Sequence, residues 1–172
     1  MKLAFTKLQT KGLFSGLFAS GLIVTSVAAS VTASVVAQSF LKRVLNPPTL
    51  SNSLQYGYSQ ATIAAPSAQL VHIAGQVGIA EDGPNDFESQ GDRSFDALVA
   101  ALEAAGTDAD NVVKITLLIV EHDADKLAYL VEKRKAVFGD TPPASTLIPV
   151  PALYAPGVLF EIDAVAVAAG DN

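Results

Sequence analysis

The side chain best placed for chemistry is Glu161, an acid inside the otherwise apolar run Val158–Ile162. A carboxylate surrounded by apolar groups has a raised pKa and can serve as a general base near neutral pH. The same carboxylate could instead pair with a cation, or with a backbone donor, across a subunit interface. Both interpretations of Glu161 remain open from the sequence.

Few other side chains could join such a site. His72 sits in a strand-like segment, where the pattern favours a hydrogen-bonded, half-buried histidine over a catalyst. His122 lies between two acids and is expected to be solvated. Lys114, in an apolar run, is the cation more able to reach a cleft, whereas Arg134 is expected to face solvent or a loop. With two histidines and no cysteine, we expect no metal site.

The composition limits the classes of partner. The 172 residues allow a single domain with a net charge of −6, and half of them are apolar. An acidic surface repels phosphate backbones, so nucleic acid is an unexpected partner. The absence of cysteine excludes disulfides, thiolate metal sites and thiol nucleophiles. A small-molecule ligand is the expected partner.

The first 37 residues have the pattern of a signal peptide. Lys2, Lys7 and Lys11 precede an uncharged stretch from Gly12 to Ala37 that is rich in small and apolar residues. Cleavage is expected after Ala37, or alternatively after Ala29, which predicts a secreted or periplasmic protein. The alternative is an uncleaved segment that anchors the chain in a membrane.

Residues 38–55 read as a linker, because Pro47-Pro48 stiffens a stretch that is otherwise polar. The remaining residues, 56–172, are expected to form the domain. Alternating or continuous apolar residues predict strands, and apolar residues spaced three and four apart predict helices. The expected elements are strands at Ala61–Ala65 and Leu70–Val77, a helix from about Arg93 to Gly106, a strand at Val112–Val120, a helix from Asp123 to Phe138, and strands at Ser145–Val150 and Val158–Ala168.

This ββαβαββ order predicts an α+β fold, a mixed sheet with two helices on one face. The run Val112–Val120 is almost wholly apolar, which predicts a strand covered on both sides. Two helices can cover only one face of the sheet. We therefore expect the other face to be buried by self-association in a symmetric oligomer.

Four short motifs in order resemble the Rid family, the reactive intermediate deaminases also called RidA or YjgF-like. They are Tyr56-Gly57-Tyr58-Ser59-Gln60-Ala61, Ile73-Ala74-Gly75-Gln76, Asn111-Val112-Val113-Lys114 and Leu159-Phe160-Glu161-Ile162-Asp163-Ala164. The resemblance spans about Tyr56–Ala168 and implies a chorismate-mutase-like Rid fold, a homotrimer and ligand clefts between subunits. For active members it implies cofactor-free hydrolysis of imines and enamines to ketoacids and ammonia.

The resemblance also implies positions for a site. The family's opening tyrosine falls on Tyr58, and the small residue and glycine of its second strand fall on Ala74 and Gly75. Its final-strand glutamate falls on Glu161, which would orient the attacking water. The ligand-contacting asparagine of its second helix falls on Val131, so that polar contact is missing.

The largest departure concerns an arginine. Deaminating members carry it just before a Ser-Thr or Ser-Cys pair, where it pairs with the substrate carboxylate. Here Ala144 precedes Ser145-Thr146, so Ala144 and Thr146 are the corresponding ligand-binding positions. Losing one partner of a buried charge pair costs about 2–5 kcal/mol. The sequence therefore predicts a metabolite-binding relative without arginine-dependent deaminase activity; the alternative is an active deaminase that uses another cation.

Overall fold

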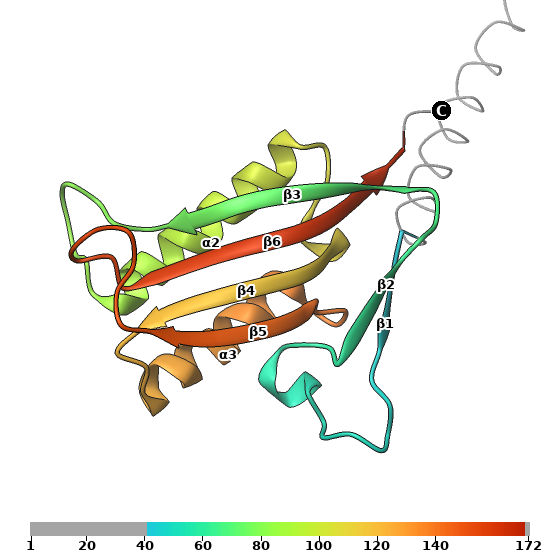
Figure 1. Cartoon of the computed structure of the whole chain (residues 1–172), viewed down its shortest axis with the longest axis horizontal. Coiled ribbons are helices and arrows are strands. Elements are labelled where there is room, and N and C mark those ends of the chain that lie inside the picture. The colour runs from blue at the N-terminus through green and yellow to red at the C-terminus, as the bar shows by residue number, and fades with distance from the viewer. Residues whose placement is uncertain (1–40, 171–172) are drawn as a thin grey trace, which may run out of the picture. The chain divides into compact units, whose positions relative to one another are not determined.

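The computed structural model describes residues 41–170, which form a sheet, a short two-stranded ribbon and two helices (Figure 1). The predicted signal peptide, residues 1–37, lies outside the described residues. The strands are β1 (Lys42–Leu45), β2 (Ala61–Ala64), β3 (Ala68–Val77), β4 (Val112–Val120), β5 (Ala144–Val150) and β6 (Phe160–Ala169); the helices are α2 (Phe87–Ala104) and α3 (Ala124–Phe138), with 3-10 turns η1 (Leu54–Tyr56) and η2 (Ala109–Asn111).

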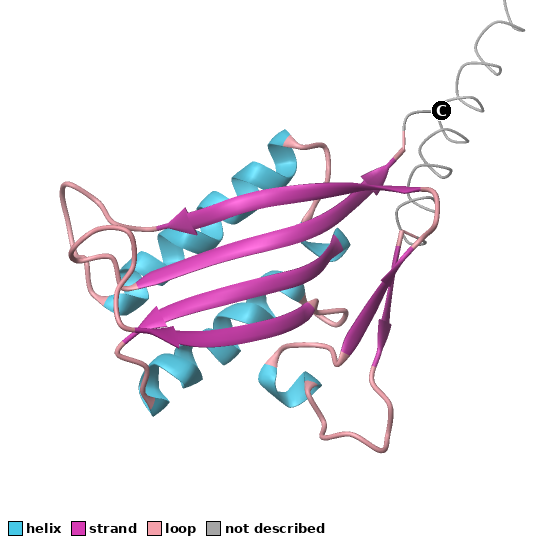
Figure 2. Ribbon diagram, viewed as in Figure 1, coloured by secondary structure: helices cyan, strands magenta, loops and turns pink. Residues whose placement is uncertain are grey.

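The main sheet has the order β3-β6-β4-β5. β6 runs antiparallel to both β3 and β4, whereas β4 and β5 are parallel and are joined through α3. Both helices lie on the same face of the sheet (Figure 2). The prediction of an α+β fold, with a mixed sheet and two helices on one face, is confirmed.

Between the helices and the sheet lies one apolar core. β4 contributes Ile115, Leu117 and Ile119, all fully buried. At the centre of the core, the ring of Phe160 stacks on Phe95 with a centroid separation of 5.9 Å. Fully burying a side chain of this size stabilises a fold by about 1.5–3 kcal/mol. This packing fixes β4 and β6, the two central strands that carry most of the candidate site.

α2 begins earlier than the sequence indicated. Residues from Phe87 onward are helical, so α2 starts six residues before the expected Arg93. Asp86 caps the helix by accepting a hydrogen bond from the backbone N–H of Ser89. The first turns of α2 are mostly polar, so they lack the apolar spacing that predicts a helix. One of these polar residues, Gln90, is nevertheless fully buried.

α3 agrees with its predicted bounds, and the Asp123 side chain caps it by accepting from the Lys126 N–H. Its inner face differs from the prediction. The apolar Leu127 is 37 % exposed, whereas the charged Arg134 is buried. The expectation that Arg134 faces solvent or a loop is therefore wrong.

The expected linker also contains structure, because Lys42–Leu45 form β1 and pair antiparallel with β2. Lys42 links the ribbon to the rest of the domain, because its Nζ donates to Val112 O at 2.9 Å and to Thr141 O at 2.8 Å. Burial lowers the pKa of Lys42 to about 8, although Asp110 and Asp108 act in the opposite direction. The fold thus holds Lys42 in a position where the charged form of its side chain is less favourable than in the unfolded chain.

This burial predicts a pH-dependent stability. Below pH 8 Lys42 is charged in both the folded and unfolded chain, and above about 10.5 it is neutral in both. Between these values the folded state binds fewer protons, so stability rises with pH. In thermal unfolding from pH 7 to 10, the melting temperature of the wild type should rise relative to that of Lys42→Met. Arg43→Met, which removes a non-titrating charge from the same strand, should show no such trend.

The sheet face opposite the helices is covered at one end, where Val113 and Val167 are buried with Leu41, and is open over the rest of its length in the single chain. Along β4, Lys114, Thr116 and Leu118 on this face are half-buried, so a single chain buries this strand fully only on its helical side. Leu70 and Ile148 on the outer strands are 56 % and 41 % exposed. Within residues 41–170, no helix is long and apolar enough to cross a membrane.

Candidate functional site

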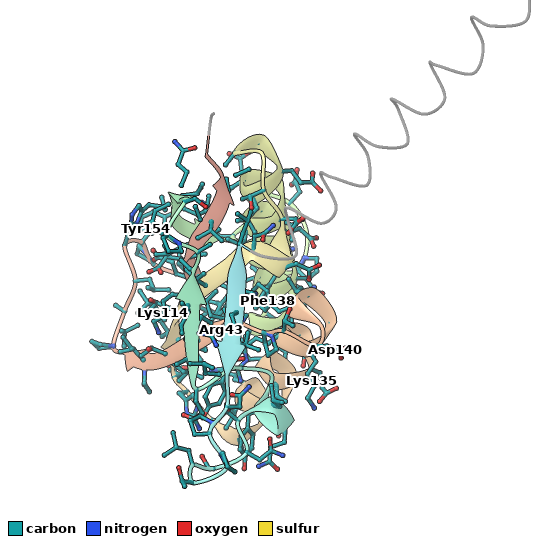
Figure 3. All side chains as sticks on the ribbon, turned by 90° about the vertical axis from the view of Figure 1, so that its right-hand side faces the viewer. Arg43, Lys114, Lys135, Phe138, Asp140 and Tyr154 are labelled. Atoms are coloured by element: carbon teal, nitrogen blue, oxygen red, sulfur yellow. The ribbon has the colours of Figure 1, made fainter. Side chains whose placement is uncertain are left out.

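Polar side chains gather on the open face of the sheet, in a group that we call the polar stripe. In one cross-strand row His72, Val165, Lys114 and Ala144 are neighbours; in the next, Asp163, Thr116 and Thr146 are neighbours. Viewed along the sheet, Lys114 lies on the side opposite Lys135 and Asp140 of the helical layer (Figure 3). The polar stripe consists of His72, Lys114, Thr116, Thr146, Glu161 and Asp163.

Glu161 and Gly75 form the first part of the site. The pairing of β3 with β6 shifts between Ile73 and Gln76, so a bulge places Gly75 beneath the Glu161 side chain. A Cβ atom on residue 75 would lie 1.8 Å from Glu161 Oε1. Glycine is therefore required for this carboxylate to lie over β3. Glu161 is half-buried, and it makes no hydrogen bond or ion pair with the described residues.

Ala74 lies in the same bulge and is exposed. Its carbonyl oxygen accepts a hydrogen bond of 2.9 Å from Gln76 Nε2. His72, one row away, is exposed rather than half-buried, and no hydrogen bond holds it among the described residues. That part of the sequence interpretation is wrong, whereas the expected exposure of His122 is confirmed.

Lys114, Ala144 and Thr146 form the second part. In the parallel pairing of β4 with β5, Lys114 is the neighbour of Ala144, the position at which the family resemblance expects an arginine. The Lys114 ammonium reaches past this small residue and donates to Thr146 Oγ1. Burial lowers the pKa of Lys114, and the nearby Asp163 carboxylate acts in the opposite direction.

Tyr58 lies beside a different cation. Its ring is 5.9 Å from the guanidinium carbon of Arg134, close enough for a cation–π contact. Arg134 also donates from Nε to Leu130 O at 3.2 Å and from Nη1 to Ser145 Oγ at 3.3 Å. Ser145 faces the helices, so Arg134 lies behind β5 rather than on the polar stripe.

Apart from Tyr58, the predicted site residues thus form two groups within one chain. In the first group Gly75 contacts Glu161, and in the second Ala144 and Thr146 lie beside Lys114. The two groups are separated along the sheet, because Glu161 pairs with Leu118, four residues along β4 from Lys114. Four residues of a strand span about 13 Å. The sequence interpretation did not include Thr116 and Asp163, although their alternation with Lys114 and Glu161 could have placed them on the same face.

Comparison with known proteins agrees with this fold. Residues 51–168 match the family described as Endoribonuclease L-PSP. The RutC family protein YjgH of Escherichia coli is 29 % identical over 113 residues, which cover 64 % of this chain and 85 % of that protein.

Among solved structures, the Rid family protein YyfB of Yersinia pestis is 32 % identical, with a TM-score of 0.70 over 74 % of this chain and 99 % of that one. Rv2704 of Mycobacterium tuberculosis, a member of the YjgF/YER057c/UK114 family, is 26 % identical, with a TM-score of 0.51 over the same shares. The family match spans most of the chain, and the motifs, sheet order and helix placement all agree with it. The chain therefore belongs to the RidA/YjgF-like family, which is also described as the endoribonuclease L-PSP family.

Proposed function

We propose that this protein binds a small metabolite in clefts between the subunits of a homotrimer, and that it lacks arginine-dependent imine deaminase activity. The observation that carries the proposal is Ala144. It stands on the open face, in register with Lys114, where deaminating relatives are expected to hold an arginine for the substrate carboxylate. A methyl group offers no hydrogen-bond donor, so the usual clamp on that carboxylate is missing.

A trimer would complete the site. The two polar groups are about 13 Å apart within one chain, too far for a small ligand to touch both. Apolar side chains, among them Leu70, Leu118 and Ile148, surround the polar stripe and favour contact with another copy. A neighbouring subunit could then bring its Gly75–Glu161 pair opposite Lys114 and Thr146.

The assembly can be tested by light scattering on the domain. We expect a mass of three chains for the wild type. Ile148→Glu, which places a charge on the open face, should reduce the mass, because burying an unpaired carboxylate is costly. Leu127→Glu is the matched control: this leucine is also about 40 % exposed but lies on α3. A monomeric wild type, or equal masses for both variants, would contradict the trimer.

The catalytic half of the proposal is tested with 2-iminopropionate, generated in situ by an amino-acid oxidase. We expect release of ammonia and pyruvate to stay at the uncatalysed rate. The loss of an arginine pair worth about 2–5 kcal/mol corresponds to a rate loss of about 30-fold to several thousand-fold. A clear acceleration by the wild-type protein would sink this half of the proposal.

One observation favours a second candidate, an active imine or enamine deaminase. Lys114 occupies the space beside Ala144 and could pair with the substrate carboxylate in place of arginine. Glu161 would then orient water for attack on the imine carbon. If acceleration is found, Lys114→Met and Glu161→Gln should each abolish it, whereas Lys135→Met on α3 should not.

We also propose that the protein is exported, because residues 1–37 have the order of charge, apolar core and small residues that signal peptides share. N-terminal sequencing of the protein recovered outside the cytoplasm should start at Gln38 or Ser30. Recovery of the intact chain from the cytoplasm alone would contradict export.

A further inference from the structure

The side-chain ammonium of Lys114 has N–H donors that make no hydrogen bond with the described residues. It is half-buried on the open face, and its hydrogen bond to Thr146 Oγ1 occupies one of its three N–H groups. No carboxylate of the described residues lies within 4.0 Å of it, since the ion pairs in this part of the chain involve Lys126, Lys133 and Lys135. Two donors on Lys114 therefore remain open on the face.

Two hydroxyl groups lie beside this ammonium. Thr116 follows Lys114 on the same face of β4, and its register partner on β5 is Thr146. The Thr116 hydroxyl makes no hydrogen bond with the described residues. Ala144, the partner of Lys114, adds only a methyl group. A cation and two hydroxyls thus converge around one open position, an arrangement suited to a carboxylate.

The fourth neighbour is an acid. Asp163 is the partner of Thr116 on β6, and its charge acts on Lys114. A plain anion would be repelled by this carboxylate, whereas a ligand with a donor beside its own carboxylate could offer that donor to Asp163. The chemistry of the position favours a small acid with a hydroxyl or amino group on the neighbouring carbon.

We propose that Lys114, Thr116 and Thr146 form an oxyanion site that binds the carboxylate of a small 2-hydroxy or 2-amino acid, with Asp163 accepting from the neighbouring donor. This inference rests on the proposed function, because it identifies the ligand class for the same open face.

The test is calorimetric titration of the full chain with three probes. Lactate carries both groups, propionate lacks the hydroxyl, and lactamide lacks the charge. We expect lactate to bind more tightly than either. Lys114→Met should weaken lactate at least tenfold and leave lactamide unchanged, and Lys114→Arg should keep most of the affinity. Lys135→Met is the control, since Lys135 pairs with Glu132 on exposed α3. Asp163→Ala, which removes the accepting oxygens, should remove the preference for lactate over propionate.

The outcomes separate the two levels of the proposal. Lactate binding that Lys114→Met leaves unchanged overturns the oxyanion site but leaves metabolite binding on this face intact. Equal binding of lactate and lactamide also overturns it. No binding of any probe to the wild type overturns the oxyanion site, whereas the trimer and deaminase measurements still decide the proposed function.

Discussion

Gly78→Ala is expected to lower the free energy of unfolding by about 3 kcal/mol, the upper part of the range for overpacking a core. A Cβ atom on residue 78 would lie 2.0 Å from Gln90 O and 2.7 Å from Gln90 C. Both are backbone atoms of α2, so no side chain can turn aside. The end of β3 and the second turn of α2 would have to separate.

The surroundings prevent an easy separation. The buried Gln90 side chain donates to Asn85 O and Gly157 O and accepts from the Leu159 N–H. On the other side, Arg93 Nε donates to Gly78 O. Moving α2 away from residue 78 would break contacts with both neighbouring loops, and each unsatisfied buried group costs about 1–3 kcal/mol.

Urea unfolding of the two proteins measures this effect. The control is Gly106→Ala, where a Cβ atom meets nothing within 4 Å and the only cost is a positive φ of 73°. That backbone conformation costs a non-glycine residue about 1–2 kcal/mol. Equal losses at the two positions would mean that the approach of β3 to α2 does not limit stability.

The same part of α2 illustrates what the sequence could not reveal. β4 was predicted to the residue, because eight of its nine residues are apolar or β-branched. The start of α2 was missed because one of its inner positions is Gln90, which is buried through hydrogen bonds rather than apolar character. A stripe of apolar residues therefore predicts only those parts of a helix whose buried side is apolar.

The site was predictable in part for a similar reason. Glu161 and Gly75 could be singled out, but their contact depends on a bulge that shifts the register of β3 against β6. The contact of Lys114 with Thr146 depends on the parallel pairing of β4 with β5, which are separated by a whole helix. Registers between distant strands come from packing, and short motifs do not encode them. Arg134 shows the converse: its charge favoured an exposed position, yet it is buried on α3.

Gly75→Ala is expected to act on the site rather than on the fold. Its Cβ atom would collide with Glu161 Oε1 and Cδ, the far end of a flexible side chain, at 1.8 and 2.7 Å. The carboxylate can swing away by rotating about its side-chain bonds, so the loss of stability should stay below about 1 kcal/mol, as for other substitutions away from the core. The carboxylate would leave its position over β3, however, and ligand affinity should fall about tenfold if Glu161 contacts the ligand across the cleft.

A double-mutant cycle decides whether the displaced carboxylate is the cause. Lactate affinity should fall to a similar extent in Gly75→Ala and Glu161→Ala, and the double variant should bind no more weakly than either single variant, because each change removes the same contact. Glu161→Ala should also restore any stability lost in Gly75→Ala, since the colliding atoms are gone. Additive losses of affinity would instead mean that Gly75 contributes through the backbone, which would place the ligand against β3 itself.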